Sequence, residues 1–298
     1  LGGDSKIGSY LKKYMGNKFQ VVTTTRRKNL VSENCIYLDL NDPENFKKYK
    51  FTGFKAAIFC AAITNQKFCE DNFDLAKNLN VFSTINLLNF LIEQDIFIIF
   101  PSTSLIFDGK KPFCPALEKA NPKGTYAKLK AEVENEIKLN YKSNFAIIRF
   151  SKIIDPNFLL FKSWIKDFHE KKKIEAFGDY FFSPIYISHC AEILEKVSQN
   201  KLNGIFNFSA KDQISYFEAL KFFSNKMVGS SKNIEKISAK LEMKSLYLPN
   251  FTTLENSLKS LIDPPSTKEV LDKFLEDNKY ISLLESTVKF FSYTFNIF

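Results

Sequence analysis

Residues 1–11, Leu-Gly-Gly-Asp-Ser-Lys-Ile-Gly-Ser-Tyr-Leu, decide the fold, because they have the pattern of a tight turn between a strand and a helix. Gly2 permits the turn, Ser5 stands where the backbone passes close to a phosphate, and Gly8 lets the helix pack closely on a sheet. The amino end of such a helix offers free N–H groups and the positive end of its dipole, which attract an anion. We therefore predict that the chain opens with a phosphate-binding turn.

Only Leu1 stands before this turn. A sheet of this kind needs a central first strand, and without that strand it should not be stable. We therefore expect that a few residues precede Leu1 and complete the strand.

Short, almost unbroken apolar runs follow the turn and alternate with stretches of helical spacing. Such runs are typical of strands buried on both faces, and strands that alternate with helices form parallel sheets. Helical spacing covers residues 78–93 and 126–139. The predicted strands are residues 20–24, 35–38, 56–60, 95–100 and 145–149.

These patterns predict an α/β fold, a Rossmann-like, doubly wound parallel sheet with a smaller C-terminal substrate-binding region. With 298 residues the chain can bury a substantial core. We predict that residues 1–149 form a dinucleotide-binding domain, which residues 183–208 rejoin. Residues 150–182 and 209–298 then form the substrate-binding region.

A basic cluster, Arg26, Arg27 and Lys28, follows the second predicted strand. Sites that prefer NAD usually end this strand with an acid that binds a ribose hydroxyl. Arg instead suits the 2′-phosphate of NADP, because its planar fork binds phosphate oxygens in pairs. The cluster therefore favours NADPH over NAD as the cofactor, and the alternative is a solvated basic loop.

A hydroxyl-bearing strand end and a Tyr-x-x-x-Lys pair form the candidate catalytic set. Residues 102–109 read Ser-Thr-Ser-Leu-Ile-Phe-Asp-Gly, and Tyr126 and Lys130 follow. These two side chains are four residues apart, so on a helix they share one face. A phenol titrates at about pH 10, and we expect the neighbouring ammonium to lower the pKa of Tyr126 toward neutrality. The alternative is a helix face with a half-buried Tyr and a solvated Lys.

With these pieces in order, the chain resembles the extended short-chain dehydrogenase/reductase superfamily. Within it, the chain is most similar to the dTDP-4-dehydrorhamnose reductases and related sugar-nucleotide reductases. The resemblance runs over nearly the whole chain. It rests on the glycine turn, the Ala-rich turn at 60–64, Asn80 and Val81, residues 102–109, Tyr126 with Lys130, and the segments 183–187, 204–209 and 214–216.

The resemblance implies NADPH-dependent reduction of a 4-keto-6-deoxy sugar nucleotide. Thr103 would hydrogen-bond the substrate oxygen, Tyr126 would donate the proton, and Lys130 would hold the nicotinamide ribose. Hydride would come from the dihydronicotinamide. The implied cofactor contacts are Gly2, Ser5, Lys6, Ile7 and Gly8 at the pyrophosphate, Asp39 and Leu40 near the adenine, and Ala61 and Ala62 near the central ribose.

Two departures leave the identity of the sugar open. Ile63 follows the Ala pair where the rhamnose-forming enzymes usually carry Tyr, and Ser104-Leu105 replaces the Asp-Tyr that normally follows the catalytic Thr. Two alternatives therefore stand beside the reductase. One is an NAD-dependent sugar-nucleotide epimerase or dehydratase on the same scaffold, and the other is a non-catalytic regulatory subunit that keeps the dinucleotide site.

The net charge of +9 could indicate nucleic-acid binding, but the lysines are scattered and no array of aromatic and Arg residues accompanies them. We expect no nucleic-acid partner, and a modest positive field favours an anionic substrate such as a sugar nucleotide. No run of 18 apolar residues exists, so we expect no membrane span.

Five cysteines are an odd number without metal-ligand spacing. We therefore expect no metal site and a reducing, cytoplasmic location. The aromatic C-terminal stretch, residues 290–298, is expected to dock on the body of the protein or on a second copy, so a homodimer is possible.

Overall fold

The computed structural model describes residues 1–278 except residues 52, 142, 230–232 and 243–246. The expected docking of the C-terminal aromatic stretch falls on residues outside the described part of the chain.

A parallel sheet forms the centre of the molecule. Four of its strands lie in the order β10 (Gly204–Phe208), β5 (Phe145–Phe150), β4 (Phe97–Thr103) and β3 (Ala56–Ile58), and every neighbouring pair is parallel. A second parallel pair joins β1 (Thr23–Thr25) to β2 (Cys35–Tyr37).

The backbone of Leu1 and Gly3 connects these two groups of strands. The Leu1 nitrogen donates to the Ile58 carbonyl at 2.8 Å, and the Cys60 N–H donates to the Leu1 carbonyl at 2.9 Å. On the other side, the Gly3 N–H donates to the Thr24 carbonyl at 2.9 Å. The spatial order is therefore β2, β1, residues 1–3, β3, β4, β5 and β10, which confirms the predicted doubly wound parallel sheet.

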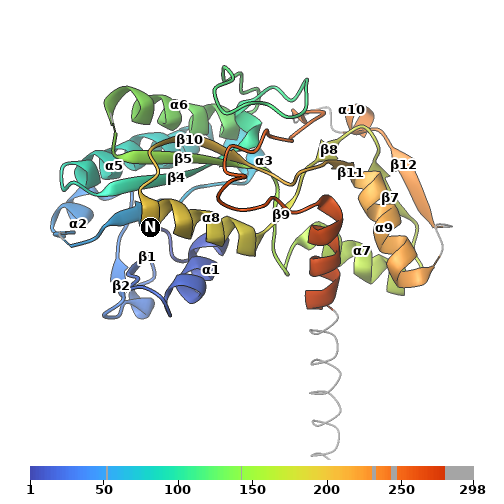
Figure 1. Ribbon diagram of the computed structural model, residues 1–298, viewed down its shortest axis with the longest axis horizontal. Coiled ribbons are helices and arrows are strands. Elements are labelled where there is room, and N and C mark those ends of the chain that lie inside the picture. The colour runs from blue at the N-terminus through green and yellow to red at the C-terminus, as the bar shows by residue number, and fades with distance from the viewer. Residues whose placement is uncertain (52, 142, 230–232, 243–246, 279–298) are drawn as a thin grey trace, which may run out of the picture.

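Helices cover both faces of this sheet (Figure 1). On one face α5 (Thr84–Ile92) and α6 (Thr125–Asn140) pack over a core that includes Leu88, Val133 and Phe100. On the other face α1 (Lys6–Met15) and α8 (Ile187–Asn200) enclose a second core. The remaining helices of this half are η1 (Lys28–Leu30), α2 (Pro43–Lys47), α3 (Gln66–Asp71), α4 (Phe73–Lys77), the π-helical η2 (Asn78–Ser83) and η3 (Ser104–Ile106).

The unbroken apolar runs follow from this double burial. Successive side chains of a strand point to opposite faces. In β4, Phe97 and Ile99 join the core under α1 and α8, whereas Ile98 and Phe100 join the core under α5 and α6. A strand covered on both sides thus requires apolar residues at every position.

A separate aromatic core lies beside the main sheet, at the right of Figure 1. Phe161, Trp164, Phe223 and Phe274 pack there with ring centroids 4.9–5.9 Å apart. Its helices are α7 (Leu159–His169), α9 (Tyr216–Val228) and residues 267–278, and the short α10 (Ala239–Glu242) lies on the same side of Figure 1. Its strands are β6 (Ile153–Ile154), β7 (Ile174–Phe177), β8 (Phe181–Phe182), β9 (Ile185–Tyr186), β11 (Ile214–Ser215) and β12 (Ile234–Ile237). The domain boundaries stay a prediction.

A buried ion pair connects three elements of the main sheet region. The Arg149 guanidinium, on β5, contacts the Glu134 carboxylate of α6 with Nη2–Oε2 at 2.6 Å, and both side chains are at most 2% exposed. The Ser102 hydroxyl, near the end of β4, donates to the same carboxylate. Arg149 also donates through Nη1 to the Ala116 carbonyl at 2.8 Å, which holds the loop between η3 and α6.

We predict that Glu134→Gln destabilises the protein by about 3–5 kcal/mol, because it leaves the Arg149 charge buried without a counter-ion. Urea unfolding measures this loss. Lys47→Met is the matched control, since it breaks an exposed pair with Glu44 and should cost less than about 1 kcal/mol. Equal losses in the two variants would contradict the role given to the buried pair.

Candidate functional site

The glycine turn closes by direct contact between backbones. Gly2 has φ +75°, and a Cβ at this position would lie 2.6 Å from the Ala61 nitrogen. A Cβ on Gly8 would overlap the Gly2 carbonyl oxygen. The absence of side chains therefore lets the turn lie on the Ala61 backbone and lets α1 begin directly behind the turn.

The amino end of α1 is capped from within the turn. The Ser5 hydroxyl accepts from the Gly8 N–H at 3.0 Å and donates to the Gly2 carbonyl at 2.8 Å. Lys6 begins the helix, and its amine lies 2.9 Å from the Asp155 carboxylate, just after β6. Ile7 instead packs on the core between α1 and α8. The cradle that a Cβ would fill, together with the helix amino end and Lys6, fits the pyrophosphate of a dinucleotide.

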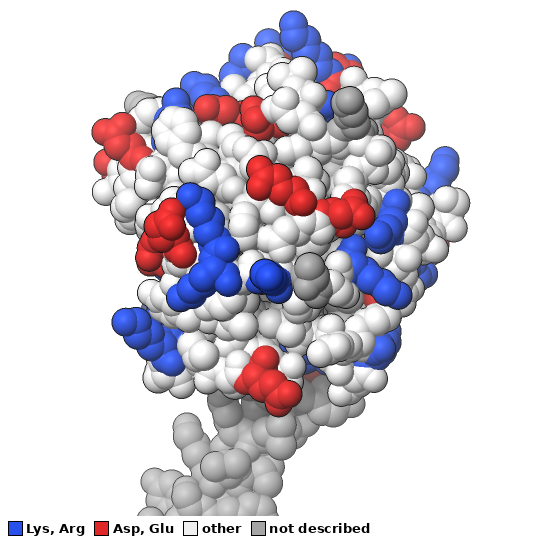
Figure 2. All heavy atoms as spheres, turned by 90° about the vertical axis from the view of Figure 1, so that its left-hand side faces the viewer, with Lys and Arg blue, Asp and Glu red and all other residues white. Residues whose placement is uncertain are grey.

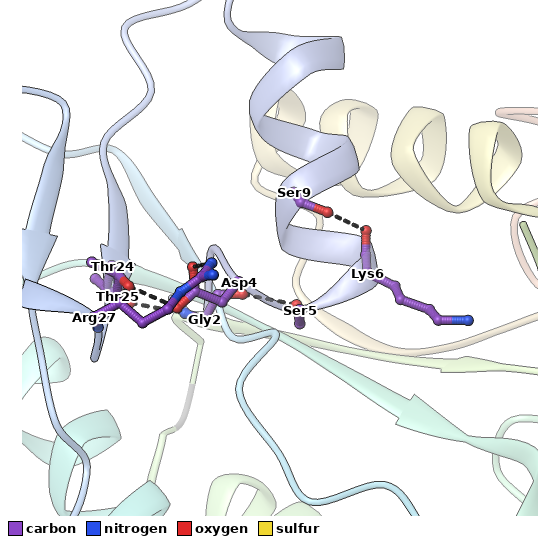
Figure 3. Close-up of polar contacts among 8 residues, drawn as sticks. All are labelled: Gly2, Asp4, Ser5, Lys6, Ser9, Thr24, Thr25 and Arg27. Atoms are coloured by element: carbon purple, nitrogen blue, oxygen red, sulfur yellow. Dashed lines mark hydrogen bonds and ion pairs between the residues drawn. The ribbon is translucent and has the colours of Figure 1, made fainter. Parts of the chain in front are cut away.

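The basic cluster lies at the carboxyl end of β1, beside this turn (Figure 3). The Arg27 guanidinium forms an ion pair with Asp4, at 2.7 Å between Nη2 and Oδ1. The Thr25 hydroxyl donates to the other carboxylate oxygen at 2.7 Å. Arg26 is exposed. No local pattern in the sequence indicates that an acid within the glycine turn engages one of the two arginines.

The residues expected near the adenine follow β2. Asp39 is half-buried, and its carboxylate accepts from the Asn41 N–H at 3.0 Å, which closes the turn after the strand. Leu40 is buried in the core under α5, so its side chain belongs to the packing of the sheet.

The Ala-rich turn after β3 is held by one buried amide. Ala61 and Ala62 are half-buried and lead into Ile63. The Asn80 side chain accepts from the Ile63 N–H and donates to the Ile63 carbonyl, both at 2.8 Å. Asn80 lies in the π-helical segment η2, where the predicted regular helix over residues 78–93 is interrupted. Such segments often occur at functional sites, and here the segment carries the amide that fixes the turn.

Two hydroxyls at the end of β4 have different surroundings. Ser102 is buried and its hydroxyl donates to Glu134. Thr103 is half-buried, and its oxygen accepts from the Leu105 N–H at 3.2 Å. Since the Thr103 oxygen acts as the acceptor in that bond, its own hydrogen is available to a further acceptor. Thr103 is therefore the better placed of the two to bind a substrate oxygen.

Helix α6 begins with an unusual cap. Glu70 of α3 accepts from both the Thr125 N–H, at 2.9 Å, and the Thr125 hydroxyl, at 2.6 Å. These two bonds lower the pKa of the Glu70 carboxyl. The cap comes from a residue 55 positions away, so local sequence could not reveal it. It fixes the turn that carries Tyr126.

Lys130 and Glu134 orient the rest of α6 against β4. The Lys130 amine donates to the Pro101 carbonyl at 2.7 Å and lies 3.6 Å from the centroid of the Phe100 ring. One turn further on, Glu134 contacts Ser102. The face of α6 that bears Tyr126, Lys130 and Glu134 therefore lies against the carboxyl end of β4.

Burial perturbs both members of the Tyr-x-x-x-Lys pair. Burial raises the pKa of Tyr126, and the neighbouring Cys69 adds to the increase. Burial lowers the pKa of Lys130 to about 7, against the opposing influence of Glu134 and Cys60. The expectation that Lys130 lowers the pKa of Tyr126 is therefore wrong in this arrangement, because desolvation dominates both groups. The idea of a solvated Lys is also wrong, since Lys130 is 5% exposed.

The sequence profile of the family described as RmlD substrate binding domain matches residues 1–279. The chain belongs to this family. This match confirms the resemblance drawn from the motifs.

Solved structures share the fold of this RmlD-family chain across nearly its whole length. The dTDP-4-dehydrorhamnose reductase of Clostridium acetobutylicum has a TM-score of 0.77 at 21% identity and covers 92% of this chain and 96% of its own. The Bacillus anthracis reductase, solved in complex with NADP, has a TM-score of 0.78 at 20% identity, with 93% and 96% covered. The UDP-glucose 4-epimerase of Thermotoga maritima has a TM-score of 0.78 at 16% identity, with 94% and 97% covered.

Curated relatives match over a shorter part of the RmlD-family chain. The methionine adenosyltransferase 2 subunit beta of Danio rerio is 28% identical in an alignment 173 residues long that covers 54% of this chain and 52% of that protein. The Xenopus tropicalis protein of the same name is 25% identical in an alignment 171 residues long that covers 54% of this chain and 51% of that protein. The chain thus spans about half the length of the curated relatives it matches.

The described residues contain no helix long and apolar enough to cross a membrane. Within that same part of the chain, no three His, Cys, Asp or Glu side chains lie together as potential metal ligands. Basic and acidic side chains are interspersed on the face shown in Figure 2.

The Lys130 pKa predicts how stability depends on pH. Between about pH 7 and the pKa of an unfolded Lys, about 10.4, the unfolded chain holds a proton that folded Lys130 has released. The free energy of unfolding therefore rises with pH in this window. Between pH 7 and 9 we expect wild type to gain about 2 kcal/mol more than Lys130→Met.

Urea unfolding at pH 7, 8 and 9 measures this difference. Lys128→Met, on the exposed side of the same helix, is the control and should keep the wild-type pH dependence. Parallel pH profiles for wild type and Lys130→Met would show that Lys130 does not titrate in this range.

Proposed function

We propose that this chain is an NADPH-dependent reductase of a 4-keto-6-deoxy sugar nucleotide. The observation that carries the proposal is the placement of the Tyr126–Lys130 face of α6 against the carboxyl end of β4, which ends in Thr103. Ligands of open α/β sheets bind at this edge. Membership of the RmlD family and the reductases among the similar structures support the same class of reaction.

The residues of the glycine turn are suited to hold the dinucleotide. Gly2 and Gly8 keep the turn free of side chains, and the first N–H groups of α1 ahead of the Ser5-capped Gly8 N–H face a pyrophosphate. Lys6 lies beside them, with its amine paired to Asp155. Ala61, directly beneath Gly2, borders the space toward the central ribose. A bound NADPH supplies the hydride.

Tyr126 is the proton donor in this proposal. Because its pKa is raised, its phenol is protonated at neutral pH. The substrate carbonyl carbon gains the hydride, and the carbonyl oxygen gains the phenol proton, so the product is an alcohol. The Thr103 hydroxyl hydrogen-bonds the same oxygen. Lys130, one turn further along α6, would hold the nicotinamide ribose, and its pKa of about 7 allows both protonation states near neutrality.

A regulatory subunit is the second candidate. Curated relatives are named as beta subunits of methionine adenosyltransferase 2. The residues after Thr103 also depart from the pattern of the reductases, since Ser104-Leu105 stands in place of Asp-Tyr. A subunit of this kind would bind the dinucleotide without consuming it.

An epimerase or dehydratase would instead hold its NAD tightly and need no added NADPH.

The decisive experiment follows NADPH absorbance at 340 nm in the presence of a panel of keto-sugar nucleotides. Steady oxidation that depends on one of them supports the reductase. Dinucleotide binding without turnover on any member supports the regulatory subunit. Conversion of a sugar nucleotide by protein purified with bound NAD, without added NADPH, supports the epimerase or dehydratase.

We predict that Tyr126→Phe lowers kcat at least about 100-fold, because general acid catalysis contributes a factor of this order. Dinucleotide affinity, measured by fluorescence titration, should stay within about twofold of wild type. Tyr141→Phe, at the other end of α6, is the control and should retain its kcat although it loses a bond to Asn89. Wild-type turnover by Tyr126→Phe would remove Tyr126 from the mechanism.

The location and assembly of the protein stay proposals. All five cysteines are free, and four are buried, which suits a reducing cytoplasm. A homodimer remains a prediction from sequence.

A further inference from the structure

One carboxylate of the glycine turn neutralises a cation that is suited to bind the 2′-phosphate of NADPH. Asp4 and Arg27 point toward one another in Figure 3, and the ion pair joins Oδ1 to Nη2 at 2.7 Å. We propose that Asp4 limits the preference for NADPH over NADH by holding the Arg27 guanidinium. This inference rests on the proposed dinucleotide site.

The Asp4 carboxylate is anchored on its second oxygen. The Thr25 hydroxyl donates to Oδ2 at 2.7 Å, and the same hydroxyl accepts from the Arg27 N–H at 3.0 Å. Thr25 is 3% exposed, so this anchor is part of the core. Asp4 is thereby fixed, whereas the long Arg27 side chain is 61% exposed and is the member that can move.

The charges at the carboxyl end of β1 determine whether Asp4 favours NADPH or NADH. Arg26 and Arg27 bring two positive charges, and Asp4 removes one of them. The bond from Arg27 is the largest influence that lowers the pKa of Asp4, so the carboxylate is ionised at neutral pH. A 2′-phosphate, which carries about −1.5 to −2 charges, would compete with Asp4 for Arg27 and would be repelled by the carboxylate.

A free 2′-hydroxyl meets the opposite situation. A hydroxyl donates readily to a carboxylate, and NAD sites use an acidic residue in this way at the end of the second strand. Residue 25, which ends β1, is a Thr, so Asp4 is the acid at this edge that can accept such a bond. Asp4 therefore opposes the two arginines in the choice of cofactor.

The test measures binding rather than turnover. Titration with NADPH and with NADH, followed by nucleotide fluorescence, yields two dissociation constants for each variant. Asp4→Asn should raise the ratio Kd(NADH)/Kd(NADPH) about tenfold at low salt, and the effect should shrink as salt increases. Asp4→Ser should act in the same direction, which keeps the test valid if Asp4→Asn folds poorly.

Two controls isolate the ion pair. Glu33→Gln removes one exposed negative charge between β1 and β2 and should leave the ratio unchanged. In Arg27→Met, the additional change Asp4→Asn should raise the ratio by a smaller factor than in wild type, because the cation that it frees is absent and only the direct effects of the carboxylate on the nucleotide remain.

An unchanged ratio in both Asp4 variants would overturn the inference, and a lower ratio would overturn it and indicate that Asp4 instead orders Arg27 for the phosphate. Failure of wild type to bind either dinucleotide would overturn the proposed function, and with it the inference. Wild type that binds both dinucleotides, with a ratio insensitive to Asp4, would leave the proposed function intact and reject the inference alone.

Discussion

The buried ion pair between Glu134 and Arg149 is the interaction on which the rest of the candidate site depends. Its carboxylate also accepts the Ser102 hydroxyl, and its guanidinium also donates to the Ala116 carbonyl. A charge buried without its partner is strongly destabilising, so the two residues fix one relative position of α6 and β5. The end of β4 and the loop before α6 are joined to the same pair. The pair therefore positions the strand that ends in Thr103 and the helix that bears Tyr126 and Lys130.

Much of the fold could be predicted because double burial leaves a simple pattern. The run at 95–100 predicted β4, and the run at 145–149 predicted β5 almost to the residue. The ends of the strands were predicted less accurately, because a strand begins and ends where its hydrogen-bonded neighbour does, and composition does not show this. The predicted strand at 20–24 begins only at Thr23, where its partner Cys35 is reached. The interruption of the helix at Asn78–Ser83 coincides with hydrogen bonds between Asn80 and a distant turn, which the spacing of apolar residues does not report.

The candidate site was accessible from sequence only where its chemistry is local. The hydroxyl at Thr103 and the four-residue spacing of Tyr126 and Lys130 stand out in the chain itself. The long-range contacts of the candidate site do not stand out in the sequence, because their partners are far apart along the chain. Glu70 lies 55 residues before Thr125, and Asp4 lies 23 residues before Arg27. The direction of the pKa shifts was also missed, because it follows from burial by the whole fold rather than from the charge next door.

The cap that Glu70 provides at the start of α6 has a consequence for protein engineering. A segment transplanted from residues 97–150 would carry the strand, the hydroxyl, the phenol and the amine, and it would look complete. It would nevertheless leave behind Glu70, whose carboxylate satisfies the first N–H of the helix. The opening turn would then fray in its new host, and the phenol would lose its orientation. Any design that borrows this candidate catalytic segment must therefore include the preceding α3 helix or install a substitute acid.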